Sequence, residues 1–561
     1  MFSRRKKKQA GGGEGKGKKP PKNRQTGNGT GRSSGSGAGS GDDSSKQKRP
    51  VSADLPSNVK WLLNELGASS DIVVRTISDS SSGMDGVLFY IDSLVDQQTI
   101  NLMVIKPILA EIGAHPGVKS PSDWIGLLKN RALSVGRIKD LHTLDETLAQ
   151  LMEGSTIIMI HGCTTAISAS TAGGEKRSVE EPSTQTVVRG PKESFTENIN
   201  TNMSLLRRRI KSPQLRAEYR QIGEQTKTHI AVVYLKGIAK DGVVQEVMSR
   251  LDRIDTDSIL ESGYIEEFIQ DAAYTPFPTI QNTERPDAAA GGILEGQVAI
   301  IVDGTPFVLL APVTFIRFFQ SSEDYYQRYD IATFLRMIRY TAFFVSMLLP
   351  SLYIAITTFH QEMLPTPLLI SLAAQREGVP FPAIVEALVM EVTFEVLREA
   401  GVRMPRVIGP AISIVGALVL GQAAVQAGLV SAAMVIVVSF TAIANFVIPA
   451  INVAIAARLI RFAMMLLGAT LGLFGIMSGL MVLLIHMASL RSFGVSYLVP
   501  FSPFVWSNWK DVFIRLPHWA MKKRPIAMAS RNNQTRQGDG QQPMTPRTPG
   551  HDHDPTSETD G

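Results

Sequence analysis

The longest uncharged stretch of the chain constrains its fold most strongly. Residues 407–457 form a run of 51 residues without Asp, Glu, Lys, Arg or His. A helix crosses the hydrocarbon core of a bilayer with about 20 apolar residues, so this run is long enough for two crossings joined by a tight turn. A second run, residues 462–490, is uncharged except for His486 and supplies another crossing. The sequence therefore predicts an integral membrane protein.

Charge is unevenly distributed along the 561 residues. The first 50 residues hold fourteen Lys or Arg against Glu14, Asp42 and Asp43, a charge of +11, which leaves −5 of the net +6 for the other residues. A flexible basic tail is attracted to anionic phospholipid by roughly 1 kcal/mol per charge near the surface. We therefore expect the tail to contact membrane lipid and not nucleic acid.

The single cysteine and the N-terminus indicate a cytoplasmic setting for the polar part. Cys163 is the one cysteine, which excludes a disulfide framework or a cysteine-based zinc site within one chain. The basic start is followed by Gly and Ser where a signal peptide needs an apolar core. The sequence contains neither Gly-x4-Gly-Lys-Ser/Thr nor His-Glu-x-x-His. We expect no enzyme activity, cofactor or metal site.

Composition predicts an α+β membrane protein, with cytoplasmic mixed α/β domains followed by an α-helical transmembrane bundle. Gly, Ser, Pro and charged residues dominate both ends, which have too little apolar surface to fold. The predicted segments are a disordered tail 1–55, a first α/β subdomain 56–152, a second 153–330, a transmembrane domain 331–490, an interfacial aromatic and basic segment 491–524, and a disordered tail 525–561.

Local patterns place the elements of the two α/β subdomains. A helix capped by Ser57 or Asn58 is expected first. Runs rich in β-branched and aromatic residues predict strands, and apolar residues at helical spacing predict helices. The expected strands are 71–77, 86–91, 155–160 (opening the second subdomain) and 229–235, the expected helices are 98–112, 141–152, 196–210 and 243–254, and a hairpin is expected over 297–312.

Crossings are predicted at 340–359, 407–424, 432–455 and 462–490. Arg336 and Arg339 precede the first crossing, which favours a cytoplasmic start. A helix over 380–400 follows a Pro-rich break and either crosses as a re-entrant or fifth segment or lies at the interface. Five crossings would place the C-terminus outside and four would place it inside, so charge alone leaves its side open.

Glu391, Glu395 and Glu399 lie within about 80° on one face of the helix expected over 380–400. An intramembrane carboxylate is costly and by default marks an ion path. The alternative is an interfacial helix in which Glu399 pairs with Arg403. Gln422 and Asn445 lie inside predicted crossings and are candidates for a pore lining or for hydrogen bonds between helices.

Two further patterns have both a structural and a functional interpretation. The glycines of the last crossing lie within about 60° on one helical face, which suits close packing of helices within the chain or between subunits; they are Gly468, Gly472, Gly475 and Gly479. The run Arg207–Arg209 suits either contact with phosphate or lipid headgroups or the solvated end of a helix.

Several long motifs resemble the A subunits of GerA-type spore germinant receptors. The resemblance extends over about residues 55–525, in order and without large gaps. The motifs are Gly-Pro-Lys-Glu-Ser-Phe-Thr-Glu-Asn-Ile-Asn-Thr-Asn-Met-Ser-Leu-Leu-Arg-Arg-Arg-Ile-Lys from Gly190, Pro-Phe-Pro-Thr-Ile-Gln-Asn-Thr-Glu-Arg-Pro-Asp from Pro276, Leu-Pro-Ser-Leu-Tyr-Ile-Ala from Leu349, Phe-His-Gln-Glu-Met-Leu-Pro from Phe359, Gly-Gln-Ala-Ala-Val from Gly421 and Ala-Ile-Ala-Asn-Phe from Ala442.

The resemblance implies a multi-pass protein of the inner spore membrane with its N-terminal domains in the cytoplasm. It also implies a permease-like B subunit and a lipoprotein C subunit as partners, and a homo-oligomer of A subunits that forms a nutrient-gated cation channel. Within that channel we expect Glu391 and Glu395 to attract cations and Gln422 and Asn445 to serve the pore or gate.

Three other functions remain open at this stage. A related sporulation membrane protein that acts with the dipicolinate channel shares the membrane motifs. A secondary transporter would show two related halves with broken helices, whereas this chain has one Pro-broken segment and no repeat. A structural scaffold that holds the other subunits is the third.

Overall fold

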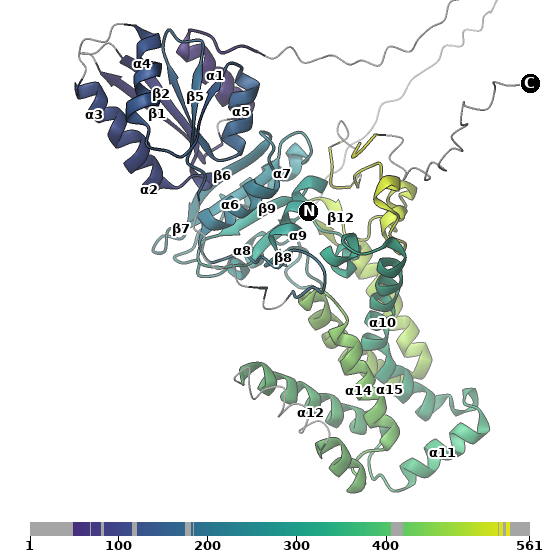
Figure 1. The fold of residues 1–561 in the computed structure, drawn as a ribbon. Coiled ribbons are helices and arrows are strands. Elements are labelled where there is room, and N and C mark those ends of the chain that lie inside the picture. The colour runs from purple at the N-terminus through teal and green to yellow at the C-terminus, as the bar shows by residue number, and fades with distance from the viewer. Residues whose placement is uncertain are drawn as a thin grey trace, which may run out of the picture. The chain divides into compact units, whose positions relative to one another are not determined.

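The computed structural model describes residues 49–67, 69–79, 84–114, 120–173, 181–182, 185–404, 419–525, 527–530 and 535–538. Most of the two predicted tails and most of the predicted crossing 407–424 lie outside these residues. The described chain begins with two α/β subdomains and continues into long apolar helices (Figure 1).

The first subdomain is a five-stranded antiparallel sheet in the order β1-β2-β4-β5-β3. Val87, Phe89 and Ile91 of β2 pack toward α1 and α5, whereas Leu88 packs toward α3 and α4. This alternation gives helices on both faces of the sheet (Figure 1). The elements are α1 (Leu55–Leu66), β1 (Ile72–Asp79), β2 (Met84–Ile91), α2 (Gln97–Ile100), the π-helical segment Asn101–Ile105, α3 (Lys106–Ala114), α4 (Pro121–Leu127), the π-helical segment Leu128–Ala132, β3 (Ile138–Leu141), α5 (Leu144–Met152), β4 (Ser155–Ile160) and β5 (Ala166–Ser170).

The sequence prediction missed α4, β3 and β5, and two further details of the first subdomain differ from it. Strand β4, expected to open the second subdomain at residue 153, pairs with β2 and so belongs to the first sheet. Helix α1 begins at Leu55, one residue before Pro56, and not after Ser57 or Asn58. The Asn58 side chain instead accepts from the Ser52 amide at 3.0 Å and donates to the Ser52 carbonyl at 2.6 Å. The Pro restricts the backbone in the first turn, which favours the earlier start.

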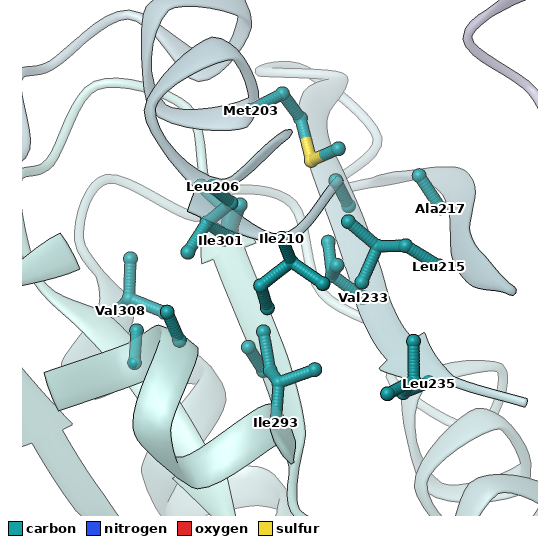
Figure 2. Packing of buried hydrophobic residues seen from close by; sticks show 14 of the residues in the cluster. Met203, Leu206, Ile210, Leu215, Ala217, Val233, Leu235, Ile293, Ile301 and Val308 are labelled. Carbon is teal, nitrogen blue, oxygen red and sulfur yellow. The ribbon is translucent and has the colours of Figure 1, made fainter. Parts of the chain in front are cut away.

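The second subdomain is a five-stranded sheet in the order β6-β7-β9-β10-β8. Residues of α6, α9 and the strands form one core, shown in Figure 2, and α7 and α8 cover the opposite face. The hairpin expected over 297–312 is present, with Leu309 opposite Ile300. The elements are α6 (Ile199–Arg209), β6 (Leu215–Ile222), β7 (Thr228–Leu235), α7 (Asp241–Leu251), α8 (Ser262–Ile269), β8 (Gln281–Thr283), α9 (Pro286–Glu295), β9 (Val298–Val302) and β10 (Val308–Ala311).

A buried ion pair joins the two subdomains. Arg207, on α6, binds both carboxylate oxygens of Asp71 at 2.8 Å, and both side chains are at most 2% exposed. Arg209 pairs with Glu193 at 2.5 Å, and Arg208 donates to the Gly173 carbonyl at 2.9 Å. The arginine run lies in the last turn of α6, as the helix-end interpretation predicted. Arg207 differs from that interpretation, because it is buried in an ion pair between the subdomains and is not solvated.

Two helices are long and apolar enough to cross a membrane, judged by length and composition within the described residues. They are α10 (Tyr329–Phe359) and α15 (Ile451–Ser489). Between them lie α11 (Thr366–Glu377), which the sequence prediction missed, α12 (Ala383–Arg403) and α14 (Ala432–Phe446). The crossing predicted over 432–455 is interrupted, because α14 ends at Phe446 and the chain passes through Pro449 before α15 begins.

Helix α15 is two antiparallel arms and not one straight crossing. Gly472 has φ 62° and ψ −143°, which breaks the helix between 451–471 and 473–489. A Cβ built at Gly479 would lie 2.9 Å from the Met464 sulfur, so residues on either side of the turn face each other. Val453 near the start of the first arm and Leu490 just after the second arm belong to the same core cluster. At 1.5 Å per residue the arms are about 30 and 25 Å long, close to the thickness of a bilayer core.

The C-terminal segment, residues 491–525, returns to the second subdomain. It contains β11 (Arg491–Ser492), β12 (Val495–Ser496), and the 3-10 helices η7 (Trp506–Asp511) and η8 (His518–Ala520). The Ser492 hydroxyl donates to the Thr279 carbonyl at 2.6 Å, and the Tyr497 hydroxyl donates to the Pro278 carbonyl at 2.8 Å. These contacts fix the segment against the loop that precedes β8.

Four charged side chains hold the start of α10 against this segment. Fully buried Arg336 binds Asp324 at 3.2 Å and Asp511 at 2.9 Å, and Arg339 binds Asp324 at 2.7 Å. Each carboxylate thus has a guanidinium partner, which offsets the cost of burying these charges. Arg336 and Arg339, from which the sequence predicted a cytoplasmic start of the first crossing, therefore also hold α10 against neighbouring segments.

Candidate functional site

The four glutamates of α12 lie in different surroundings. Glu386 and Glu391 are buried, the Glu395 side chain is 25% exposed, and the Glu399 side chain is 62% exposed. The i, i+4 spacing places Glu391, Glu395 and Glu399 along one side of the helix. The first two of these three face α15.

Glu391 forms a buried ion pair with Arg461 of α15. The guanidinium lies 2.9 Å from Oε2 of Glu391, and the two side chains are 0% and 1% exposed. Burying one such charge alone is costly, so each member requires the other. Both carboxylate oxygens of Glu391 and Nε of Arg461 are buried without a hydrogen-bond partner among the described residues. The pair is thus electrically matched but incompletely hydrogen-bonded.

Glu395 extends this pair into a cluster. Its carboxylate lies 3.1 Å from Arg458 and 3.4 Å from Arg461, and it also contacts Arg398 on its own helix. Two carboxylates and three guanidinium groups therefore meet between α12 and α15. We call Glu391, Glu395, Arg398, Arg458 and Arg461 the ionic cluster.

The other two glutamates make local contacts. Glu386 accepts from the Ser431 amide at 3.0 Å and faces Arg376 at 3.4 Å, which ties α12 to the start of α14 and to α11. Glu399 pairs with Arg403 at 2.6 Å on an exposed surface. This last pair is the one that the interfacial alternative anticipated. An exposed i, i+4 pair of this kind contributes little to stability.

The two polar candidates from the predicted crossings are separated from each other. The Asn445 side chain accepts from the Ser346 hydroxyl at 3.2 Å, a hydrogen bond between α14 and α10. Gln422 lies in the helical residues 419–426, and its side chain is exposed. Of the four candidates, the structure brings Glu391 and Glu395 into one cluster. Asn445 makes no contact with that cluster but lines a cavity together with two of its arginines, and Gln422 does not line that cavity.

A polar cavity of about 620 Å³ adjoins the ionic cluster. From the helices it is lined by Arg398, Glu399, Asn445, Asn452 and Arg458, and from the second subdomain by polar residues that include Gln281, Arg285, Arg317 and Ser321. Its volume lies within the range of about 300–1,000 Å³ of small-molecule sites. Water and ions can therefore approach the cluster from this side.

The role of two arginines of α15 was not predicted from the sequence. Arg458 was treated only as the boundary of an uncharged run, although Arg458 and Arg461 interrupt apolar sequence at helical spacing. An ionisable side chain inside an apolar segment requires a partner, and the glutamates of α12 were the available carboxylates. That requirement was the signal that could have identified the cluster.

The four glycines of α15 pack within the chain. A Cβ at Gly468 would lie 2.8 Å from the Ser351 carbonyl oxygen of α10, and one at Gly472 would lie 2.7 Å from the His360 ring. Gly475 and Gly479 face the first arm of α15, at Leu467 and Met464. The prediction that all four share one face of one helix is wrong, because the turn at Gly472 separates them.

Metal ligation is not indicated in the described ranges. No group of three or more His, Cys, Asp or Glu side chains there is placed to hold a metal ion. Cys163 is buried in the first subdomain, and burial raises the pKa of its thiol. The chemistry that the described residues offer is therefore ionic pairing in an apolar environment.

Curated relatives match the chain over most of their length. Spore germination protein KA of Bacillus subtilis (strain 168) is 49% identical over 501 residues, which cover 89% of this chain and 91% of that protein. Spore germination protein GerLA of Bacillus cereus is 37% identical over 85% of this chain and 96% of that protein. Stage V sporulation protein AF of Bacillus subtilis (strain 168) is 31% identical over 87% and 98%.

A solved structure and a family profile also match. The N-terminal domain of the A subunit of the Bacillus megaterium spore germinant receptor GerK3 is 35% identical, with a TM-score of 0.37, and covers 48% of this chain and 99% of that chain. The profile of the Bacillus/Clostridium GerA spore germination protein matches residues 60–527. The breadth of the profile match and the identity of the relatives establish that the chain belongs to the GerA spore germination protein family.

Proposed function

We propose that this chain is the A subunit of a nutrient-sensing spore germinant receptor, and that it oligomerises into a cation channel whose opening triggers germination. Family membership supports a role in spore germination. The channel and the oligomer are our extension of that role. They rest on the charges and the exposed surfaces of the apolar helices.

The ionic cluster is the observation that carries the channel proposal. Ionisable residues inside membrane segments are costly and by default mark an ion pathway. The Glu391–Arg461 pair has buried atoms without hydrogen-bond partners, so its net contribution to stability is small. Arg398 and Arg458 line the cavity, and Arg458 in turn pairs with Glu395 at 3.1 Å. We propose that these pairs separate when the channel opens, which frees the carboxylates to attract cations.

Exposed apolar side chains support membrane insertion and assembly. On α14, Ile436, Ile443 and Phe446 are each more than 60% exposed. On α12, Val392 is 52% and Val396 63% exposed. Such surfaces need lipid or another protein chain as a partner. A single A subunit exposes them on the helices next to the ionic cluster, where neighbouring copies would complete a pore wall.

The remaining parts of the proposal follow from the family. We place the protein in the inner spore membrane as a multi-pass protein with its α/β subdomains in the cytoplasm. Its proposed partners are a permease-like B subunit, a lipoprotein C subunit and further A subunits. We propose that the chain is not an enzyme. The higher identity to spore germination protein KA than to Stage V sporulation protein AF favours the receptor over the related sporulation protein.

Potassium release from nutrient-treated spores tests the role of the cluster. Glu391→Gln and Glu395→Gln should each change the rate of release, because each removes a charge that the arginines balance. Glu399→Gln is the matched control, since its exposed pair with Arg403 lies outside the cluster. Receptor abundance in the spore membrane is measured alongside. Release at the rate of the unmodified chain in both cluster variants, at equal abundance, would remove these residues from the mechanism.

Single-channel recording of the purified oligomer separates a pore from a scaffold. We expect cation currents across a bilayer, altered by Glu395→Gln. An oligomer that inserts but gives no current under any nutrient or partner condition favours the scaffold. Flux of a labelled solute without channel currents favours a transporter.

A further inference from the structure

An exposed aromatic patch lies on the C-terminal segment. Phe504, Trp506 and Ile514 are 61%, 76% and 58% exposed. Amphipathic aromatic side chains at such positions favour the boundary between headgroups and acyl chains. The patch therefore has the chemistry of a lipid-facing surface.

A series of tilted and edge-on ring contacts connects this patch to the first apolar helix. Phe504 packs against Trp509 with 5.5 Å between ring centroids, Trp509 lies 6.0 Å from Phe513, and Phe513 lies 5.0 Å from Tyr340 of α10. The salt bridge between Arg336 and Asp511 holds the same two elements together. The patch is thus continuous with a helix that is long and apolar enough to cross a membrane.

A cavity of about 220 Å³ lies against the same C-terminal segment, where it is lined by Lys510, Asp511 and Val512, the residues between Trp509 and Phe513. Apolar side chains line part of it, among them Val499, Val512 and Met521. Its cationic side chains are Arg317, Lys510, Lys522, Lys523 and Arg536. The volume is below the range of about 300–1,000 Å³ of typical small-molecule sites, so it suits one end of an amphiphile and not a whole nutrient.

The charge of this cavity favours an anion. Five cationic side chains and the carboxylates of Glu295 and Asp511 give a sum of 5 − 2 = +3. Asp511 is already bound by Arg336 at 2.9 Å and by the Tyr325 hydroxyl at 2.7 Å, and Glu295 faces Arg317 at 3.5 Å. Both carboxylates therefore have partners, which leaves an excess of positive charge at the rim.

We propose that this cavity binds the phosphate-bearing headgroup of an anionic phospholipid, while Phe504 and Trp506 insert beside its acyl chains. The lysines bind the phosphate, and the apolar lining covers the glycerol backbone. Bound lipid would hold the C-terminal segment, and through Arg336 the start of α10, at the membrane surface. This inference rests on the membrane location in the proposed function and is independent of ion conduction.

Lipid titration of the full-length protein in detergent micelles tests the site. Short-chain phosphatidylglycerol should bind saturably and more tightly than short-chain phosphatidylcholine. The triple variant Lys510→Glu, Lys522→Glu, Lys523→Glu should weaken phosphatidylglycerol binding by more than about a hundredfold, because loss of each lysine removes about fivefold and each new carboxylate adds repulsion. The matched control is Lys60→Glu, Lys106→Glu, Lys139→Glu, which changes the same charge on exposed positions of the first subdomain and should bind normally.

Trp506→Ala and free phosphate distinguish the alternatives. Trp506→Ala should weaken lipid binding several-fold without lowering the melting temperature, since the side chain is exposed. Equal affinity for the two lipids, normal binding by the triple variant, or displacement of the lipid by equimolar inorganic phosphate would each overturn the proposal. A change in oligomer mass with unchanged lipid binding in Trp506→Ala would assign the patch to a protein partner instead. Solubility of the full chain without detergent would reject the membrane location itself.

Discussion

At the scale of single residues, the most informative contact is the one between Glu391 and Arg461. The two residues are 70 positions apart (461 − 391), so helical spacing predicts the glutamates as a row of repelling charges and gives no partner. The folded chain supplies that partner from α15, at a site that is almost inaccessible to solvent.

Arg461→Ala should destabilise the helical part by about 3–5 kcal/mol, because it leaves Glu391 buried and unpaired. The double variant Glu391→Leu, Arg461→Met should recover most of this loss, since it removes both charges together. Thermal unfolding of the purified protein in detergent micelles measures the effect. Arg403→Ala, which breaks only an exposed pair, should cost less than about 1 kcal/mol. If the double variant were as unstable as Arg461→Ala, the unpaired charge of Glu391 would not be the cause of the lost stability.

Glu266 of α8 should make the stability of the second subdomain depend on pH. Burial, with smaller contributions from Glu261 and Glu267, raises the pKa of its carboxyl from 4.5 to about 7. Between about pH 4.5 and pH 7 the Glu266 carboxyl therefore keeps its proton in the folded state, whereas the unfolded chain has already released it. By linkage, its contribution to stability is complete below about pH 4.5 and is lost as pH rises through about 7.

Glu266→Gln should therefore unfold at a higher temperature than the unmodified chain above about pH 7 and at the same temperature below about pH 4.5. Thermal melts of the full-length protein across this range measure the difference. Glu224→Gln serves as the control, because its side chain is exposed in the same subdomain and does not contribute to the shifted pKa of Glu266. An equal shift at both ends of the pH range would attribute the effect to packing and not to protonation.

At the scale of elements, the turn at Gly472 changes the architecture most. The sequence predicts one crossing over 462–490, because apolar composition does not distinguish a long helix from two arms. The left-handed backbone at Gly472 and the close approach of His360 both exclude a larger side chain without strain. Gly468, Gly472, Gly475 and Gly479, which the sequence placed on one packing face of a helix, lie at this turn or close to it.

Cysteine cross-linking tests the two arms directly. In a Cys163→Ser background, Met464→Cys with Gly479→Cys should form a disulfide, because these positions face each other across the turn. In a straight helix the 15-residue separation would place them about 22 Å apart, beyond the roughly 7 Å that a disulfide spans between Cα atoms. Met464→Cys with exposed Met481→Cys is the control pair and should stay reduced. Absence of the first cross-link in membranes would rule out the hairpin.

At the scale of the whole molecule, the return of residues 491–525 to the second subdomain bears on the side of the C-terminus. Hydrogen bonds from Ser492 and Tyr497 to residues 278–279, and the Asp511–Arg336 pair, tie this segment to the polar part of the chain. A hairpin at Gly472 returns the chain to the end of the apolar helices from which α15 starts. The contacts of residues 491–525 therefore place this segment beside the polar second subdomain.

Labelling of single cysteines in sealed membranes should therefore find both ends of the described chain on one side. In a Cys163→Ser background, Lys236→Cys in the second subdomain and Lys510→Cys in the C-terminal segment should react with an impermeant thiol reagent from the same side. Leu368→Cys of α11 should react from the opposite side, because α10 separates it from the α/β subdomains. Opposite labelling of positions 236 and 510 would contradict this arrangement.

The sequence by itself determined the class of protein, most strands and helices of the two α/β subdomains, and the place where the polar part gives way to apolar helices. The spacing of apolar residues, alternating in strands and every three or four residues in helices, is a local property of the sequence. It indicates which face of an element is buried. Tertiary structure alone decided that β4 joins the first sheet, that α15 turns back at Gly472, and that Glu391 meets Arg461. Each of these features depends on which distant segment of the chain packs against the element. Burial makes the native neighbour energetically favoured over others. The spacing of residues along the sequence does not identify that neighbour.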